Sequence, residues 1–259
     1  MSILITGTSR GLGKAIAGRL TQMGKSVVAV TRDDADLSRM DEVGRLAKDI
    51  ASRHSDLEVL INNAGVSKST REITRDGFET TFATNYMAPF LLSNLLLPVL
   101  ARNHGTIVNV GSEQHRWVRA IPWDDLQGER HFQPIEQYSL TKLYLVLLTR
   151  EMARRSPDVI VSCVSPGFLR TDLGRDAKGF FRVFLTLARP FQRSPERGAE
   201  SVIHAMEARA TGVYFRGTRQ VAPSKLGLDD TSSAMLWELS ANALHLAHLG
   251  WTGPPTPPG

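Results

Sequence analysis

The chain has 259 residues, of which 42% are hydrophobic and 22% charged, and this suits a single globular domain with a sizeable core. It carries 31 Lys or Arg against 26 Asp or Glu, and the positive excess is dispersed among apolar residues without a recognised nucleic-acid module, so we expect no nucleic-acid partner. Because no apolar run reaches the roughly 18 residues of a membrane span, because the N-terminus lacks a signal core, and because Cys163 is the one cysteine, we expect a cytoplasmic protein without an integral membrane segment.

Short strand-like runs alternate with longer helix-like segments along the chain. Continuously apolar strands that alternate with helices indicate a parallel sheet covered on both faces. The expected fold class is therefore α/β: a single-domain, Rossmann-type, doubly wound parallel sheet with flanking helices over residues 1–250, and a flexible tail over 251–259. The predicted strands are 3–6, 27–31, 58–62, 106–110, 159–164 and 213–215, and the predicted helices are 11–23, 38–53, 76–102, 136–155 and 194–208.

The first predicted strand runs directly into TGTSRGLG, residues 6–13, and then into a helix. Gly7, Gly11 and Gly13 would let the chain turn tightly and let backbone N–H groups approach a phosphate at the helix N-terminus, where the dipole favours an anion. Because a strand precedes the loop and a helix follows it, we interpret the loop as a phosphate site. A glycine-rich connection without a ligand is the alternative.

The second predicted strand ends in VTRD. In a doubly wound sheet the residue at this end faces the adenosine ribose, and arginine there suits a 2'-phosphate. Arg32 and Arg10 therefore favour NADP(H) over NAD(H), although Asp33 tempers the preference and plain surface arginines are the alternative. Ser38, with Asp41 three residues later, predicts a capping box at the next helix.

Further motifs follow later in the chain. NNAG spans residues 62–65, Asn85 lies in TNYMAPF, Ser112 ends VNVGS, and SPG spans 165–167. Tyr138 and Lys142 are four residues apart, which places them on one face of the predicted helix. Taken alone, this pair could equally be two solvated surface side chains.

Together with the glycine loop, the order of these motifs resembles the short-chain dehydrogenase/reductase family over residues 1 to about 225. TRDGFETTFATNYMAPFLL, IPWDDLQGE and SPGFLRTDL are most similar to its retinol dehydrogenase and WW-domain oxidoreductase branch. The resemblance implies an NADP(H)-dependent enzyme that reversibly reduces a ketone or aldehyde group. Its substrate would be a small molecule that is fairly apolar and bulky for its class. It also implies a homodimer or homotetramer, although apolar helix faces can equally be buried internally.

The resemblance implies that Asn85, Ser112, Tyr138 and Lys142 are catalytic. A phenol has an ordinary pKa of about 10, so Lys142 and the charge of the oxidised nicotinamide would favour the phenolate in a closed, partly desolvated site. In reduction Tyr138 would give a proton to the carbonyl oxygen while Ser112 stabilises the developing negative charge. Lys142 would also hold the cofactor ribose, and Asn85 would order a water relay.

The resemblance further implies which residues bind the cofactor. The NNAG backbone would line the adenosine side, and Pro166, Gly167 and Thr171 would contact the nicotinamide end; Asn62 and Asn63 could instead be structural links between strands. The expected cofactor-binding residues are Gly7, Ser9, Arg10, Gly11, Leu12, Gly13, Arg32, Asp36, Leu37, Asn63, Ala64, Gly65, Tyr138, Lys142, Pro166, Gly167, Phe168 and Thr171.

The chain departs from the family pattern after the second strand. Only residues 33–35 separate VTR from DLS, where the family usually has a helix and a third strand. We therefore expect this unit to be missing or reduced to a turn, with Asp36 and Leu37 supplying the adenine contacts.

Two substrate loops are expected. The loop over 113–135, between Ser112 and Tyr138, is longer than is usual in the family, and its aromatic residues could wall a substrate pocket or pack within the loop. Its histidines lack metal-ligand spacing, so we expect no metal. The segment over 168–193 could be a mobile lid, a membrane-surface helix or an ordinary amphipathic helix. The side chains concerned are His115, Trp117, Trp123 and His131 in the first loop and Phe168, Phe180, Phe181 and Phe184 in the second.

Two other functions compete with the reductase. A non-catalytic NADP(H)-binding sensor would use the same fold, but it has no need of all four catalytic groups. A sugar-nucleotide epimerase or dehydratase is disfavoured by the small C-terminal portion after residue 195.

Overall fold

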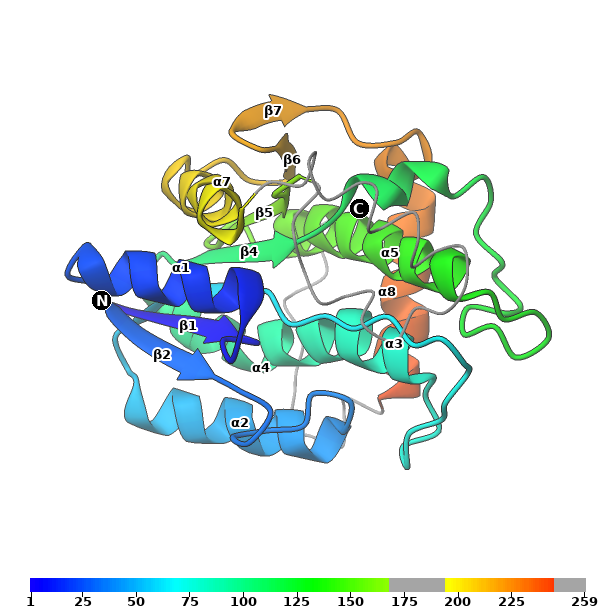
Figure 1. Ribbon diagram of the computed structural model, residues 1–259, viewed down its shortest axis with the longest axis horizontal. Coiled ribbons are helices and arrows are strands. Elements are labelled where there is room, and N and C mark those ends of the chain that lie inside the picture. The colour runs from blue at the N-terminus through cyan, green and yellow to red at the C-terminus, as the bar shows by residue number, and fades with distance from the viewer. Residues whose placement is uncertain (168–193, 245–259) are drawn as a thin grey trace.

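The computed structural model describes residues 1–167 and 194–244 of the chain. These residues form a seven-stranded sheet with helices on both faces (Figure 1), which confirms the expected fold class. The strand order is β2-β1-β3-β4-β5-β6-β7, and every neighbouring pair is parallel except β6 and β7. The strands are β1 Ser2–Thr6, β2 Ser26–Val30, β3 Leu57–Asn62, β4 Thr106–Val110, β5 Ile160–Ser165, β6 Val213–Arg216 and β7 Arg219–Val221.

The helices form two layers, one on each face of the sheet (Figure 1). Helices α1 (Gly11–Gln22) and α7 (Pro195–Glu207) pack against each other on one face, over an apolar cluster built around the central strands. The other face carries α2, α4 and α5, with α8 packed on the outer side of α5. The bounds of these helices are α2 Met40–Arg53, α4 Ala88–Arg102, α5 Pro134–Arg155 and α8 Asp230–Ala243, and shorter helical turns are α3 Thr80–Phe82, η1 Ala83–Met87, η2 Glu113–Trp117 and η5 Leu226–Leu228.

The continuous helical run Thr80–Arg102 is long and apolar enough to be tested as a membrane span. In the fold, 83% of its most apolar window is buried, and α4 packs beside α2 and against β3. Within residues 1–167 and 194–244, it is the one helix that meets these criteria. Its apolar composition is thus accounted for by the protein core.

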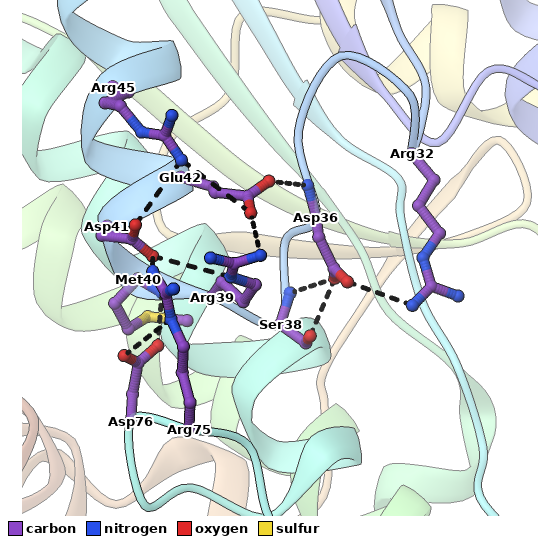
Figure 2. A network of polar contacts seen from close by, with 10 residues as sticks. All are labelled: Arg32, Asp36, Ser38, Arg39, Met40, Asp41, Glu42, Arg45, Arg75 and Asp76. Carbon is purple, nitrogen blue, oxygen red and sulfur yellow. Dashed lines mark hydrogen bonds and ion pairs between the residues drawn. The ribbon is translucent and has the colours of Figure 1, made fainter.

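The third strand of the usual family pattern is missing. β2 forms the edge of the sheet, and residues 31–39 connect it to α2 through turns. A polar network takes the place of the missing unit (Figure 2). In this network the carboxylate of Asp36 accepts hydrogen bonds from Ser38 and pairs with Arg32, while Arg75 pairs with Asp41 across the start of α2.

The expected capping box at Ser38 is wrong. The N-cap of α2 is Arg39, and the Ser38 hydroxyl donates to Asp36 at 2.7 Å instead of accepting from the helix. The N–H of Met40 donates to the carboxylate of Asp76 at 2.7 Å, so a distant loop caps this helix (Figure 2). By contrast, Ser194 caps α7, because its hydroxyl accepts from Arg197 N at 3.5 Å.

Two elements near the C-terminus, β7 and α8, were not predicted from the sequence. β7 pairs antiparallel with β6 after a turn at Gly217, whose φ is 61°. α8 begins after Asp229, which accepts a hydrogen bond from Thr231 N. The indole of Trp237 on α8 packs edge-on against Phe90 at 4.9 Å and thereby covers the α4 and α5 layer.

Candidate active site

The carboxyl ends of the parallel strands lie at one edge of the sheet, and four sequence motifs follow them there (Figure 1). The glycine loop follows β1, NNAG continues β3, Ser112 follows β4, and SPG continues β5. The strand order reverses between β1 and β3, and in open α/β sheets ligands bind at this switch point. The fold therefore brings the expected site segments together.

The glycine loop is shaped for close backbone approach. A Cβ at Gly13 would lie 2.1 Å from the Gly7 carbonyl oxygen, and one at Gly7 would lie 2.8 Å from Ala64 Cα. Gly11 has a φ of 53° and faces open space. The N-terminus of α1 has neither a side-chain cap nor an acidic residue in its first turn, so its N–H groups can donate hydrogen bonds to an anion such as the pyrophosphate of a dinucleotide.

Asn62 and Asn63 are structural links, one of the two alternatives raised by the sequence. The Asn62 side chain donates to Ser93 at 3.0 Å and to Asn109 at 2.9 Å, which ties β3 to β4 and α4. The Asn63 side chain donates to the backbone oxygens of Thr6 at 2.8 Å and Gly7 at 3.2 Å. The Asn63 side chain thus links NNAG to the end of β1 and to the glycine loop.

The residues expected at the adenine end differ in exposure. The side chain of Arg32 is 81% exposed and pairs with Asp36 at 3.0 Å. Although partial burial raises the pKa of Asp36, hydrogen bonds from Ser38 and Arg32 bring it below its ordinary value. Leu37 is buried in the core, whereas Ser9 and Arg10 lie exposed beside the start of α1.

Tyr138 and Lys142 occupy one face of α5, and that face is turned towards the ends of β4 and β5. Nζ of Lys142 lies 5.5 Å from the centroid of the Tyr138 ring and donates to the Val110 carbonyl at 2.9 Å. The Ser112 hydroxyl lies next to the Tyr138 hydroxyl and interacts with it. The tyrosine, the serine and the lysine therefore form one connected group.

The protein's own groups shift the pKa values of Tyr138 and Lys142 in opposite directions. Burial raises the pKa of the Tyr138 phenol, and the neighbouring Ser112 hydroxyl only partly offsets this. Burial lowers the pKa of Lys142 to about 8, because desolvation disfavours the ammonium form. The protein alone therefore favours the neutral phenol, and Lys142 Nζ lies over the face of the Tyr138 ring. That Lys142 and the oxidised nicotinamide together favour the phenolate stays a prediction.

Asn85 is fully buried in the π-helical turn η1, a local irregularity that recurs at functional sites. Its Oδ1 accepts from Val66 N at 2.8 Å, and its Nδ2 donates to Val66 O at 2.9 Å and to Thr141 at 3.1 Å. The amide therefore fixes the segment after NNAG to α5. For a water relay, this leaves only the second acceptor position of Oδ1.

A family model for short chain dehydrogenases matches residues 33–179 of the chain. This chain belongs to the short-chain dehydrogenase family. It is 32% identical over 272 residues to a Streptomyces sp. (strain C5) protein assigned as a daunorubicin C-13 ketoreductase, covering 94% of this chain and 92% of that protein. It is 31% identical over 281 residues to human retinol dehydrogenase 13, covering 95% and 85% of the two chains.

Solved structures agree with this short-chain dehydrogenase fold. A Mycobacterium paratuberculosis protein superposes with a TM-score of 0.75 at 26% identity, covering 94% of this chain and 93% of the other. A Pseudomonas sp. B-0831 3-alpha-hydroxysteroid dehydrogenase complexed with NADH superposes with a TM-score of 0.71 at 24% identity, covering 83% and 94%. The chain is thus an oxidoreductase of alcohol and carbonyl groups, in a family that binds NAD(H) or NADP(H).

In this short-chain dehydrogenase the aromatic residues of the loop over 113–135 differ in burial. Trp123 packs against the core and His115 is fully buried, whereas Trp117 is 62% exposed. Gln127 fixes the loop, because its side-chain oxygen accepts from Glu79 N at 2.8 Å. In the described part of the chain, no His, Cys, Asp and Glu cluster could hold a metal ion.

Sequence reasoning missed two threonines that support the site. The Thr6 hydroxyl accepts from the N–H groups of Asn63 and Ala64 at 3.1 Å each, and Thr141 accepts from Asn85. The signal available in the sequence was that Thr6 begins the glycine loop and that Thr141 lies between Tyr138 and Lys142. Pro166 is buried and Gly167 has a φ of 94°, whereas the expected site residues Phe168 and Thr171, the loop over 168–193 and the tail lie outside the described residues.

Proposed function

We propose that this short-chain dehydrogenase reduces a ketone or aldehyde of an apolar, bulky small molecule to the alcohol with NADPH, reversibly, and uses Tyr138 as its general acid and base. The observation that carries this proposal is the connected group of Ser112, Tyr138 and Lys142 at the carboxyl edge of the sheet, beside the open N-terminus of α1. A protein that only senses a dinucleotide needs the second feature but not the first.

Each residue in this group has a defined task. When bound, NADPH would supply the hydride. Tyr138, whose phenol is protonated at neutral pH, donates its proton to the substrate oxygen. Ser112 Oγ accepts from Gln114 N at 3.2 Å, so its own hydrogen is left to be donated to the developing negative charge. Lys142 is placed to bind the cofactor ribose and to add positive charge beside the phenol.

The preference for NADPH rests on the arginines near the end of β2. Arg32 is largely exposed and could exchange its pairing with Asp36 for a 2'-phosphate, and Arg10 adds a second guanidinium at the start of α1. Among solved structures of similar fold, some contain NADH and others NADP, so the cofactor must be tested on this chain.

The substrate class rests on exposed apolar side chains in the segment between Ser112 and Tyr138 and on the relatives. Trp117 and Ile135, towards the two ends of this segment, are 62% and 42% exposed. Relatives named for daunorubicin and for retinol act, by those names, on large and largely apolar molecules. We place the activity in the cytoplasm, where the buried free thiol of Cys163 stays reduced.

An assay of NADPH and NADH oxidation tests the proposal. The purified chain is mixed with decanal, acetophenone, all-trans-retinal and daunorubicin, each with either cofactor. We expect turnover of at least one carbonyl, with kcat/KM for NADPH at least about tenfold above that for NADH, a difference of about 1.4 kcal/mol. NADPH binding without turnover of any of the four would favour the sensor function.

A further inference from the structure

His115 is fully buried directly behind Ser112 and bridges two segments that are far apart in the sequence. Its Nδ1 lies 2.7 Å from the Ser112 carbonyl oxygen, and its Nε2 accepts from Ser224 N at 3.1 Å. The imidazole also packs against the Tyr214 ring, with the centroids 4.7 Å apart. The ring is therefore held from three sides.

These contacts fix the protonation state of the imidazole. The Ser224 N–H can only donate, so Nε2 must be unprotonated, and the Ser112 carbonyl can only accept, so Nδ1 must carry the hydrogen. His115 is consequently neutral and in the Nδ1–H form. Burial favours the same state, because it lowers the pKa of His115.

The neighbouring residues of η2 are tied to the same distant segments. Glu113 accepts from the Tyr214 hydroxyl at 2.7 Å, and Arg116 donates to the Ala222 carbonyl at 2.5 Å. The Ser224 hydroxyl in turn accepts from Gly227 N at 3.2 Å. The turn η2, which follows Ser112, is thus hydrogen-bonded to β6 and to the connection after β7.

We propose that His115 is a positioning residue for Ser112, an inference that rests on the proposed function. Its Nδ1–H holds the Ser112 peptide, and the Gln114 N–H holds the Ser112 Oγ, so that the hydroxyl faces Tyr138 and the site of the substrate oxygen. A donor that stabilises developing charge must be held within about 0.5 Å of its productive position, and a support behind its backbone provides this.

Two substitutions separate the ends of the imidazole. In His115→Asn the amide takes the place of Nδ1 and keeps a donor for Ser112, whereas in His115→Gln it reaches the place of Nε2 and keeps a partner for Ser224. We expect His115→Gln to lower kcat about tenfold and His115→Asn less than about threefold, with the KM for NADPH unchanged in both. The matched control is His131→Gln, because His131 lies in the same loop with its side chain 70% exposed.

A double-mutant cycle with Ser112→Ala distinguishes positioning from general stability. If His115 acts through the serine hydroxyl, His115→Gln costs nothing further once that hydroxyl is gone. A tenfold loss that persists in the Ser112→Ala background, or no loss of kcat in His115→Gln, would overturn the proposal. If His115→Gln does not fold, the same cycle is run with His115→Asn, for which the proposal requires a loss below threefold that vanishes without the hydroxyl.

Nitrogen NMR of the histidine-labelled wild-type protein tests the same contact without turnover. We expect His115 to show a protonated Nδ1 and an unprotonated Nε2 at neutral pH, and a charged or Nε2-protonated ring contradicts the proposal. If wild type turns over no carbonyl but the Nδ1–H form is present, the proposed function has failed while the contact stands; if turnover occurs and the Nδ1–H form is absent, the positioning role alone has failed.

Discussion

Lys142 holds its ammonium group almost entirely out of water, with 4% of its surface exposed. Its Nζ donates to Val110 and lies beside the Tyr138 ring. Burial lowers its pKa from the ordinary 10.5 to about 8. The charge that this residue supplies is therefore lost just above neutral pH.

The lowered pKa of Lys142 has opposite effects on activity and on stability as pH rises. As pH rises through about 8, the folded protein loses the Lys142 charge, so kcat/KM for NADPH should fall. Between pH 8 and 10.5 the unfolded chain still binds this proton and the folded chain does not, so the contribution of Lys142 to stability rises with pH in that window. A pH profile of kcat/KM checks the first effect, and Lys142→Met should lack that alkaline limb; a limb that survives the substitution belongs to another group.

Arg32 governs cofactor choice in this account. Arg32→Ala should raise the Kd of NADPH by about tenfold, or about 1.4 kcal/mol, and leave that of NADH unchanged. Asp36→Asn should instead tighten NADPH binding, because it releases Arg32 from its ion pair. Fluorescence titration with both cofactors measures these changes, and Arg45→Ala, on the same network but 70% exposed on α2, is the control. Equal losses for NADPH and NADH in Arg32→Ala would show that Arg32 does not contact a 2'-phosphate.

Among the helices, α8 closes the layer formed by α4 and α5. Trp237 on α8 is 2% exposed and contacts Phe90, the Tyr86 hydroxyl is hydrogen-bonded to Ser240 at 2.7 Å, and Arg155 on α5 lies over the indole at 4.9 Å. These contacts bury apolar faces of α4 and α5 within one chain, which was one of the two alternatives raised by the sequence. Helix α8 therefore supports the helix that carries Tyr138.

Removing the indole should destabilise the fold. Trp237→Ala should lower the free energy of unfolding by about 3–5 kcal/mol, because a large buried side chain leaves a cavity that the surroundings fill only in part. Met235→Ala, at a position 43% exposed on the same helix, should change it by less than about 0.5 kcal/mol. Urea unfolding compares the two, and similar midpoints for both variants would mean that α8 is not part of the cooperative core.

At the scale of the whole molecule, the doubly wound sheet and the gathering of motifs at one edge could be predicted from sequence. Apolar runs such as ILIT and VIVSCV mark buried parallel strands, and a parallel sheet necessarily brings their carboxyl ends together. The missing third strand was predictable too, because residues 33–35 are too few to form it.

The remaining features depend on contacts between distant segments. The cap of α2 comes from Asp76, the support of Ser112 involves Ser224, and β7 exists only because it pairs with β6. Local patterns at Ser38 or His115 carry no signal of these partners. The raised pKa of Tyr138 likewise follows from burial, which the four-residue spacing to Lys142 cannot reveal.

Single-turnover kinetics of Tyr138→Phe beside wild type, with NADPH affinity measured on the same samples, test whether Tyr138 is the proton donor. Because the phenol alone is removed, the rate of carbonyl reduction should fall by about a thousandfold, within the range for loss of a general acid, while the Kd of NADPH changes less than about twofold. A variant that reduces the same carbonyl as fast as wild type would contradict the account, since the proton would then come from another group.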